Sequence, residues 1–223
     1  MIHRLPFWVF AGSVLLALNA GFINSVALLS FVNNAVSHVT GTATIAAEAL
    51  TRHDWQLLWH TGAIILSFIA GAVISGLVIG NEALKLGRRY GVALLIESAL
   101  LLFAWYGFTH NTFHAEWLAS AACGLQNAMV ATYSGSVIRT THLTGIVSDI
   151  GSALGNLLAG RGFARPQFIL QTAIFFAFIG GAAAGAVGFR SYGYDAVLFN
   201  GIWVMLVALA YMTLLFRAAG REH

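Results

Sequence analysis

The sequence predicts an all-α integral membrane protein with six full transmembrane helices, two short re-entrant or broken helices and an internal repeat. Hydrophobic residues make up 59% of the 223 residues and charged residues only 9%, whereas soluble domains carry about 25% charged residues. Six apolar segments approach or exceed the roughly 20 residues that cross a hydrocarbon core. A His-x-Thr-Gly motif also occurs once in each half. We therefore expect residues 1–223 to form one transmembrane domain.

The six expected spans follow one another with short connections. They are residues 7–32, 58–80, 90–108, 117–138, 168–189 and 196–216. The apolar run of the first is too long for a typical cleaved signal peptide, so we interpret it as a span. Two weaker segments, residues 39–50 and 143–160, are short or contain several polar residues and glycines. We expect these two to be the re-entrant or broken helices.

The positions of Lys and Arg indicate which segments cross. Short cytoplasmic loops carry an excess of these residues. With six spans and a cytoplasmic N-terminus, nine of the 11 lie inside, and only Arg52 and Arg190 lie outside. If both weak segments crossed as well, the count would be six against five. The count favours six spans with both termini in the cytoplasm.

An internal repeat divides the chain into residues 1–108 and 109–223. Each half contains a Gly-x-x-Asn pattern, which ends at Asn24 or Asn127, and then the His-x-Thr-Gly motif. Three crossings per repeat is an odd number, so the second repeat would be inverted relative to the first. Inverted repeats with discontinuous helices are common in transporters and place the binding site near the membrane midplane. Eight crossings would instead make the repeats parallel.

The paired motifs are the best candidates for a substrate-binding site. Their candidate residues are His38, Thr40 and Gly41 in the first half and His142, Thr144 and Gly145 in the second. A short helix that begins at each motif would direct its free N–H groups and positive dipole end at an anion or a polar group. Alternatively, nearby hydroxyl groups only cap the two helices. Because the motif is duplicated, we favour the binding site.

Three side-chain amides lie inside the predicted spans. Asn24, Gln126 and Asn127 each need a hydrogen-bonding partner in a hydrocarbon environment. They could contact the solute or tie neighbouring helices together. Asn24 and Asn127 occupy matching places in the two halves, which favours a shared role in supporting the site.

Two carboxylates are candidates for ion or proton coupling. Asp149 lies four residues after Gly145, and Glu97 lies well inside the third span. Carboxylates inside a membrane are costly and often belong to ion or proton pathways. Glu48 precedes Arg52 by four residues, so we expect a surface ion pair there.

No cofactor and no metal site are expected. Cys123 is the lone cysteine, and His110 and His114 lack a third ligand. The Lys and Arg residues lie at segment ends and form no patch for nucleic acid. Three Gly-x-x-x-Gly patterns, at residues 76–80, 151–155 and 181–185, are typical of helix contacts within the chain or between subunits of a homo-oligomer.

At these same residues the chain resembles the YoaK-like family of bacterial inner-membrane proteins, a family of unknown function. The resemblance is carried by residues 21–24, 37–41, 124–128 and 140–145, together with Asp149. It implies a multi-pass protein of the bacterial inner membrane, of a kind generally labelled a candidate small-molecule transporter. This chain departs from the family at Thr42, where Asn is common, so we expect no amide role there.

We therefore expect a transporter or channel for a small polar or anionic solute, with its site between the two repeats. The alternative is a membrane scaffold or accessory subunit that transports nothing and whose motifs serve helix packing. An intramembrane enzyme is disfavoured because no nucleophile–base pair is recognisable, although His142 and Asp149 could form a base and its orienting group.

Overall fold

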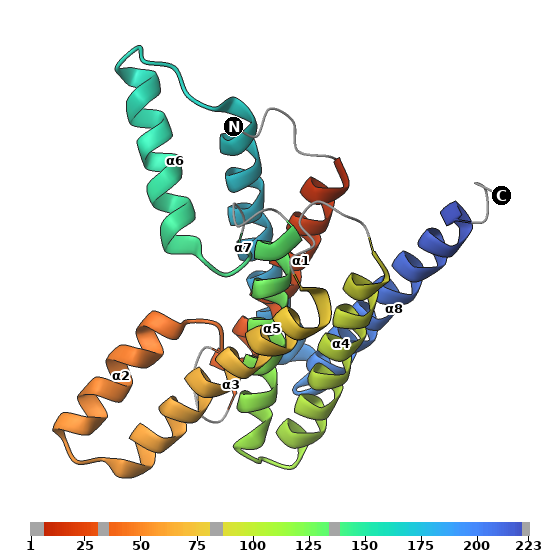
Figure 1. Ribbon diagram of the computed structural model, residues 1–223. Coiled ribbons are helices and arrows are strands. Elements are labelled where there is room, and N and C mark those ends of the chain that lie inside the picture. The colour runs from red at the N-terminus through yellow and green to blue at the C-terminus, as the bar shows by residue number, and fades with distance from the viewer. Residues whose placement is uncertain (1–6, 31–35, 81–86, 134–138, 220–223) are drawn as a thin grey trace.

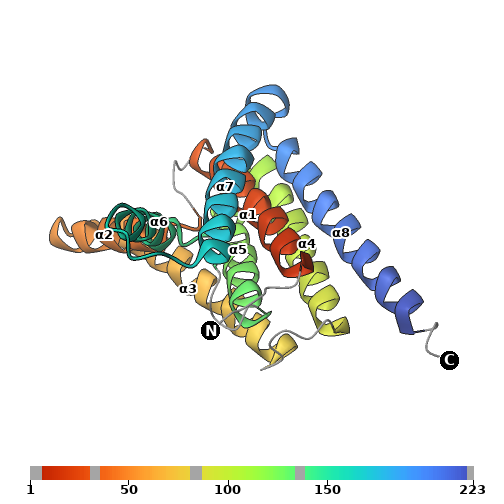
Figure 2. The same ribbon diagram turned by 90° about the horizontal axis from the view of Figure 1, so that it is seen from above.

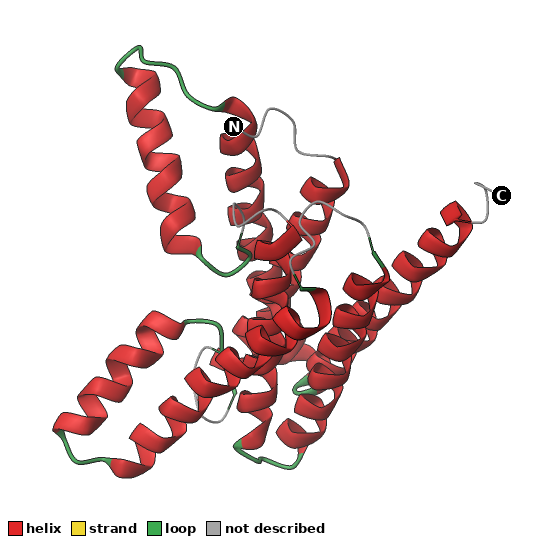
Figure 3. Ribbon diagram, in the orientation of Figure 1, coloured by secondary structure: helices red, strands yellow, loops and turns green. Residues whose placement is uncertain are grey.

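The computed structural model describes residues 7–30, 36–80, 87–133 and 139–219. These residues form eight α-helices and no strand (Figures 1 and 3). The helices are α1 (Phe7–Leu28), α2 (Val39–Thr51), α3 (Trp55–Ile79), α4 (Arg88–Thr109), α5 (His114–Tyr133), α6 (Leu143–Leu158), α7 (Arg165–Tyr192) and α8 (Asp195–Ala219). The all-α class is confirmed. The expected ends of the first and fourth spans, residues 31–32 and 134–138, lie outside the described residues.

Five of these helices, α1, α3, α4, α7 and α8, are long and apolar enough to cross a membrane. The fourth predicted span, residues 117–138, corresponds to α5, which does not belong to this group. Its sequence contains Glu116, Gln126 and Asn127, which lower its hydropathy. The helix lies at the centre of the bundle, between α1, α3 and α4, and most of its residues are buried (Figures 1 and 2). A helix covered by other helices has little need of an apolar surface.

Glycines bring α1 and α7 into close contact. A side chain at Gly21 of α1 would overlap the carbonyl oxygen of Phe178, and one at Gly181 of α7 would overlap the carbonyl oxygen of Leu18. Gly185 faces the backbone of α1 in the same way. The predicted Gly-x-x-x-Gly contact at residues 181–185 is therefore made within the chain.

The contact between α3 and α5 is built in the same way, from the two glycines that correspond to Gly21 and Gly181. A side chain at Gly124 of α5 would overlap the carbonyl oxygen of Phe68, and one at Gly71 of α3 would overlap that of Ala121. Without a Cβ at these positions, the backbones approach closely enough for weak Cα–H···O contacts. The two helix pairs thus fix α1 and α5, the helices that precede the two motifs.

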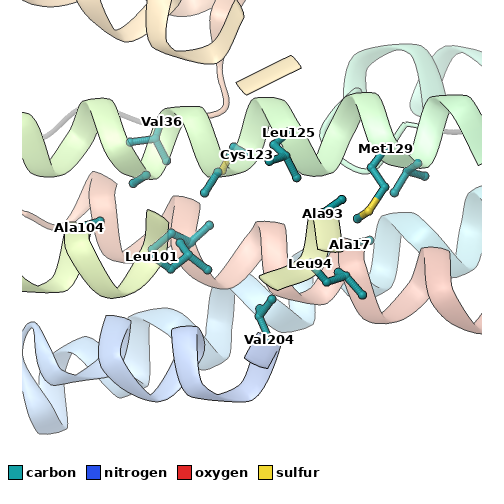
Figure 4. Close-up of a cluster of buried hydrophobic side chains, with 14 of the residues drawn as sticks. Ala17, Val36, Ala93, Leu94, Leu101, Ala104, Cys123, Leu125, Met129 and Val204 are labelled. Carbon is teal, nitrogen blue, oxygen red and sulfur yellow. The ribbon is translucent and has the colours of Figure 1, made fainter. Parts of the chain in front are cut away.

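Small and branched apolar side chains fill the space between α1, α4, α5 and α8. Ala17, Ala93, Leu101, Leu125 and Val204 belong to this buried cluster (Figure 4). The alanines allow the helices to lie close together, and the leucines fill the remaining space. This core holds α5 rigidly beside α4, so that polar side chains on these two helices face one another.

The two short helices lie at the edge of this core, to which α6 contributes Ile146. α2 has 13 residues and packs on α3, whereas α6 has 16 residues and packs on α7. At about 1.5 Å per residue, each is shorter than the roughly 30 Å of a hydrocarbon core. Both begin near the centre of the molecule and run to opposite ends of it (Figure 1). Seen from above they overlap, so they lie on the same flank of the bundle (Figure 2).

Candidate functional site

Each motif is held by the asparagine of the preceding helix. Asn24 Oδ1 accepts hydrogen bonds from the Ser37 backbone N–H (3.1 Å) and hydroxyl (2.8 Å). Asn127 Oδ1 accepts from the Thr141 backbone N–H (3.4 Å) and hydroxyl (3.1 Å). Ser37 and Thr141 directly precede the motif histidines. The two asparagines therefore position the points at which α2 and α6 begin.

His38 and His142 are the N-cap residues of the two short helices. Their backbones are nearly identical, with φ −91° and ψ 60° at His38 and φ −89° and ψ 56° at His142. Neither side chain forms a capping hydrogen bond. The N–H groups of the first helical turn have no carbonyl partner within their own helix. Residues 39–41 and 143–145 therefore present free donors at the start of each helix.

The two motifs meet at one cavity of about 320 Å³. Its walls are residues 37–41, Phe68, Asn127, Arg139, Thr141, His142, Leu143 and Thr144. The structure thus brings together the predicted residues His38, Thr40, Gly41, Asn127, His142 and Thr144. Gly145 lies next to this wall in the first turn of α6, and Asn24 lies behind it.

The cavity is electropositive. Each helix N-terminus carries the equivalent of about half a positive charge, and Arg139 adds a guanidinium group. No acidic side chain is found among the described residues that line it. The hydroxyl groups of Thr40 and Thr144 are further possible donors. Such a surface suits an anion or a strongly polar acceptor.

Arg139 is a candidate site residue that sequence reasoning missed. Its position directly after the fourth expected span, residues 117–138, made it a topology signal in the charge count. The available clue was its place in the sequence. Arg139 directly precedes residues 140–145, one of the segments that carry the family resemblance. The structure places it on the cavity wall.

Gly145 has a steric role that Gly41 lacks. A Cβ at Gly145 would lie 2.5 Å from Cε1 and 2.6 Å from Nδ1 of His142. The imidazole ring therefore lies against the first turn of α6. It occupies the space that the Cβ of any other residue at position 145 would need. A Cβ at Gly41 would meet no atom within 4 Å. The two halves of the cavity are similar but not identical.

The remaining predicted residues do not line the cavity. Gln126 lies behind it and donates from Nε2 to the Thr140 hydroxyl (3.2 Å). Asp149 faces α7, where it accepts from Gln171 Nε2 (2.6 Å) in a separate pocket of about 210 Å³. Glu97 is 1% exposed and accepts from Asn19. Coupling by Asp149 or Glu97 stays a prediction.

Outside the cavity, charged or titratable side chains pair at two further places among the described residues. Glu48 pairs with Arg52 at the end of α2, as expected. His60 of α3 and Glu116 of α5 form a buried pair with 3.0 Å between Nε2 and Oε2, which the sequence did not reveal because the two lie 56 residues apart. In the part of the chain that the structure describes, no group of three or more His, Cys, Asp or Glu side chains could hold a metal ion.

The fold and the cavity together define a class, that of all-helical, multi-pass membrane-type proteins. The chain belongs to the family described as protein of unknown function (DUF1275), which matches residues 12–215. The resemblance to YoaK-like proteins is thereby confirmed. No curated protein and no solved structure matches the chain.

Proposed function

We propose that the protein is a membrane transporter or channel for a small anion, which binds between the N-termini of α2 and α6. The observation that carries this proposal is the cavity that both motifs and Arg139 line. Two helix N-termini and a guanidinium group favour negative charge, and their effect grows where water is excluded. Exposed His38, Thr40, His142 and Thr144 side chains are available for binding.

The size of the cavity limits the class of solute. Its volume of about 320 Å³ is at the small end of the range for ligand sites, which is roughly 300–1,000 Å³. An inorganic oxyanion or a short carboxylate, with part of its hydration shell, suits this space. Phosphate, sulfate, nitrate and formate are therefore the first solutes to test.

The expected topology supports transport through this site. We infer six crossings, by α1, α3, α4, α5, α7 and α8, in two inverted repeats at residues 1–108 and 109–223. Matching hydrogen bonds at Asn24 and Asn127 and matching glycine contacts at Gly21 and Gly124 support the repeat. α2 and α6 run from the centre to opposite ends (Figure 1). The site would then lie near the midplane of a bacterial inner membrane, with both termini cytoplasmic.

Anion binding to the purified full-length protein is the decisive measurement. We expect phosphate, sulfate, nitrate or formate to bind in isothermal titration and to be taken up by proteoliposomes. Arg139→Gln should weaken binding about tenfold or more, because a charge-assisted hydrogen bond contributes about 1.5–3 kcal/mol. Arg190→Gln is the matched control, since Arg190 is an exposed residue near the end of α7.

Two outcomes would overturn the proposal. Either none of the four anions binds, or Arg139→Gln and wild-type protein bind them equally. Both would favour the alternative of a scaffold whose motifs serve only packing.

A further inference from the structure

A buried polar cluster connects α4 to the second motif. Asn19 Nδ2 donates to Glu97 Oε1 (2.9 Å) and to Gln126 Oε1 (2.8 Å). Gln126 Nε2 donates to the Leu16 carbonyl oxygen (2.7 Å) and to the Thr140 hydroxyl (3.2 Å). Asn19, Glu97, Gln126 and Thr140 are all at most 3% exposed. A continuous chain of hydrogen bonds therefore runs from Glu97 to the residue that precedes Thr141 of the cavity.

Two acceptor atoms of the cluster have no hydrogen-bond donor. Two side-chain amides supply four N–H groups, and the four bonds above use all of them. Asn19 Oδ1 and Glu97 Oε2 remain buried without a partner among the described residues. Turning the Asn19 amide over would not help, because its oxygen would then face two other acceptors, Glu97 Oε1 and Gln126 Oε1.

The surroundings of Glu97 do not compensate a negative charge. α1 carries no titratable side chain, and α5 brings only the Cys123 thiol close enough to interact with Glu97 electrostatically. The other titratable side chains that the structure describes on α3, α4, α5 and α8 lie at helix ends or have other partners: His60, Arg88, Arg89, Tyr90, Tyr106, His114, Glu116, Asp195, Tyr211 and Arg217. A buried carboxylate with one hydrogen bond and no cation is very costly.

We propose that Glu97 is protonated in this conformation, and that its proton couples to the cavity through Asn19, Gln126 and Thr140. The proton removes the buried charge and turns Oε2 from an unpartnered acceptor into a hydrogen-bond donor. The coupling to transport rests on the proposed function; the protonation of Glu97 does not.

Loss of the proton gives a mechanism for the coupling. When the Oε2–H bond breaks, the proton goes to water and the carboxylate needs further donors. Its nearest donor is Asn19 Nδ2, which it shares with Gln126. A stronger bond from Asn19 to the carboxylate weakens the bond to Gln126, and Gln126 in turn holds Thr140. The second motif is then less firmly held at the cavity wall.

The coupling is confined to one half of the molecule. Gln126 follows Gly124 by two residues, and the matching residue after Gly21 is Ile23, which has no polar side chain. Among the described residues, the first motif therefore has no equivalent link to a buried carboxyl group. Only the wall built from Arg139, Thr141 and His142 should respond to the proton.

Infrared spectroscopy of the full-length protein in lipid nanodiscs tests the protonation. We expect a C=O band of a neutral carboxylic acid near neutral pH, which shifts in D₂O and with glutamate ¹³C-labelled at the side-chain carboxyl group. Glu97→Gln should remove this band. Glu116→Gln should keep it, because Glu116 is as buried but accepts from Ser30 and pairs with His60.

The infrared test of protonation does not depend on Glu97→Gln alone. If Glu97→Gln does not fold, the wild-type band and its ¹³C shift, with Glu116→Gln as control, still report a neutral glutamic acid. The proposal is overturned if the wild-type protein shows no neutral glutamic acid band, or if the band is lost in Glu116→Gln.

Cysteine reactivity tests the link to the cavity without any solute. Thr144→Cys and Thr40→Cys are placed on the two walls, and buried Cys123 stays native. The ratio of their labelling rates with a membrane-impermeant thiol reagent cancels the ionisation of the new thiols. We expect this ratio to change about fivefold or more across the pH range in which the infrared band disappears, and the change to be lost in Gln126→Leu.

A ratio that does not change, or that changes equally in Gln126→Leu, would overturn the coupling. Failure of the proposed function is a separate result. If no anion binds but the band and the ratio behave as expected, a proton-linked change in the cavity stands and anion transport does not.

Discussion

Asn24 and Asn127 make the same pair of hydrogen bonds in the two halves of the chain. Each side-chain oxygen accepts from the backbone N–H and the hydroxyl group of the residue before a motif histidine. The asparagine oxygen thus satisfies a backbone N–H that lies just before the helix and has no carbonyl partner there. The start of each short helix is fixed by a single amide, and the free donors of the first turn are left for the cavity.

Removing these amides should destabilise the protein unequally. Asn24→Ala leaves the buried N–H and hydroxyl of Ser37 without a partner, so we expect a loss of about 1–3 kcal/mol in the free energy of unfolding. Asn127→Ala should cost less, because its bonds to Thr141 are longer and its side chain is only half-buried. Thermal unfolding of the purified variants in detergent measures the difference. Equal losses, or a larger loss for Asn127→Ala, would contradict this.

The two motif glycines should respond differently to substitution. Gly145→Ala places a methyl group against the exposed His142 ring, so the ring must leave its place on the cavity wall, and we expect weaker anion binding. Gly41→Ala is the matched control, because a methyl group there meets open space. If the methyl group acts through the His142 ring, Gly145→Ala/His142→Ala should bind anions as tightly as His142→Ala alone. If it does not, the steric explanation is wrong.

The glycines of α7 and α6 offer a second matched comparison. Gly181→Val directs a branched side chain into the backbone of α1. We expect the free energy of unfolding to fall by more than the roughly 1–3 kcal/mol typical of overpacking. The reason is that a backbone atom, unlike the end of a side chain, cannot shift without moving its helix. Gly151→Val has open space around it and should keep the fold. Size-exclusion profiles and thermal unfolding of both variants measure this. Aggregation of Gly151→Val alone would show that its open face is itself an interface.

Much of this arrangement could be predicted from sequence because the information is local. The apolar segments, the short weak segments and the repeated His-x-Thr-Gly motif are read along the chain, and the structure has helices at each of them. The meeting of the two motifs followed from their duplication. α5 was predicted as a helix, but its low hydropathy becomes understandable only once the helices that cover it are known.

Contacts that depend on tertiary packing were harder to predict from the sequence. Asp149 does lie on the same side of α6 as Gly145, as the i, i+4 spacing requires, yet that helix turns Asp149 towards Gln171 of α7. The rotation of a helix about its axis is set by the helix it packs on. In the same way, the cluster of Asn19, Glu97 and Gln126 joins three helices, and no spacing in the sequence relates them.

The orientation of the short helices is the last prediction, and it tests the inverted repeat. α2 ends at Thr51 and α6 ends at Leu158, at opposite ends of the molecule (Figure 1). Thr51→Cys in intact bacterial cells should react with a membrane-impermeant thiol reagent from outside, whereas Leu158→Cys should react only in inside-out vesicles. Both residues are exposed, and native Cys123 is buried, so the labelling reports the new thiols.

The charge distribution predicts this outcome. Arg52 follows Thr51, and it is one of only two basic residues that six crossings place outside, whereas Arg161 follows Leu158 on the cytoplasmic side. Labelling of both cysteines from the same side would exclude opposed re-entrant helices. The two N-termini could then not face one another across the midplane, and the anion site would need a different topology.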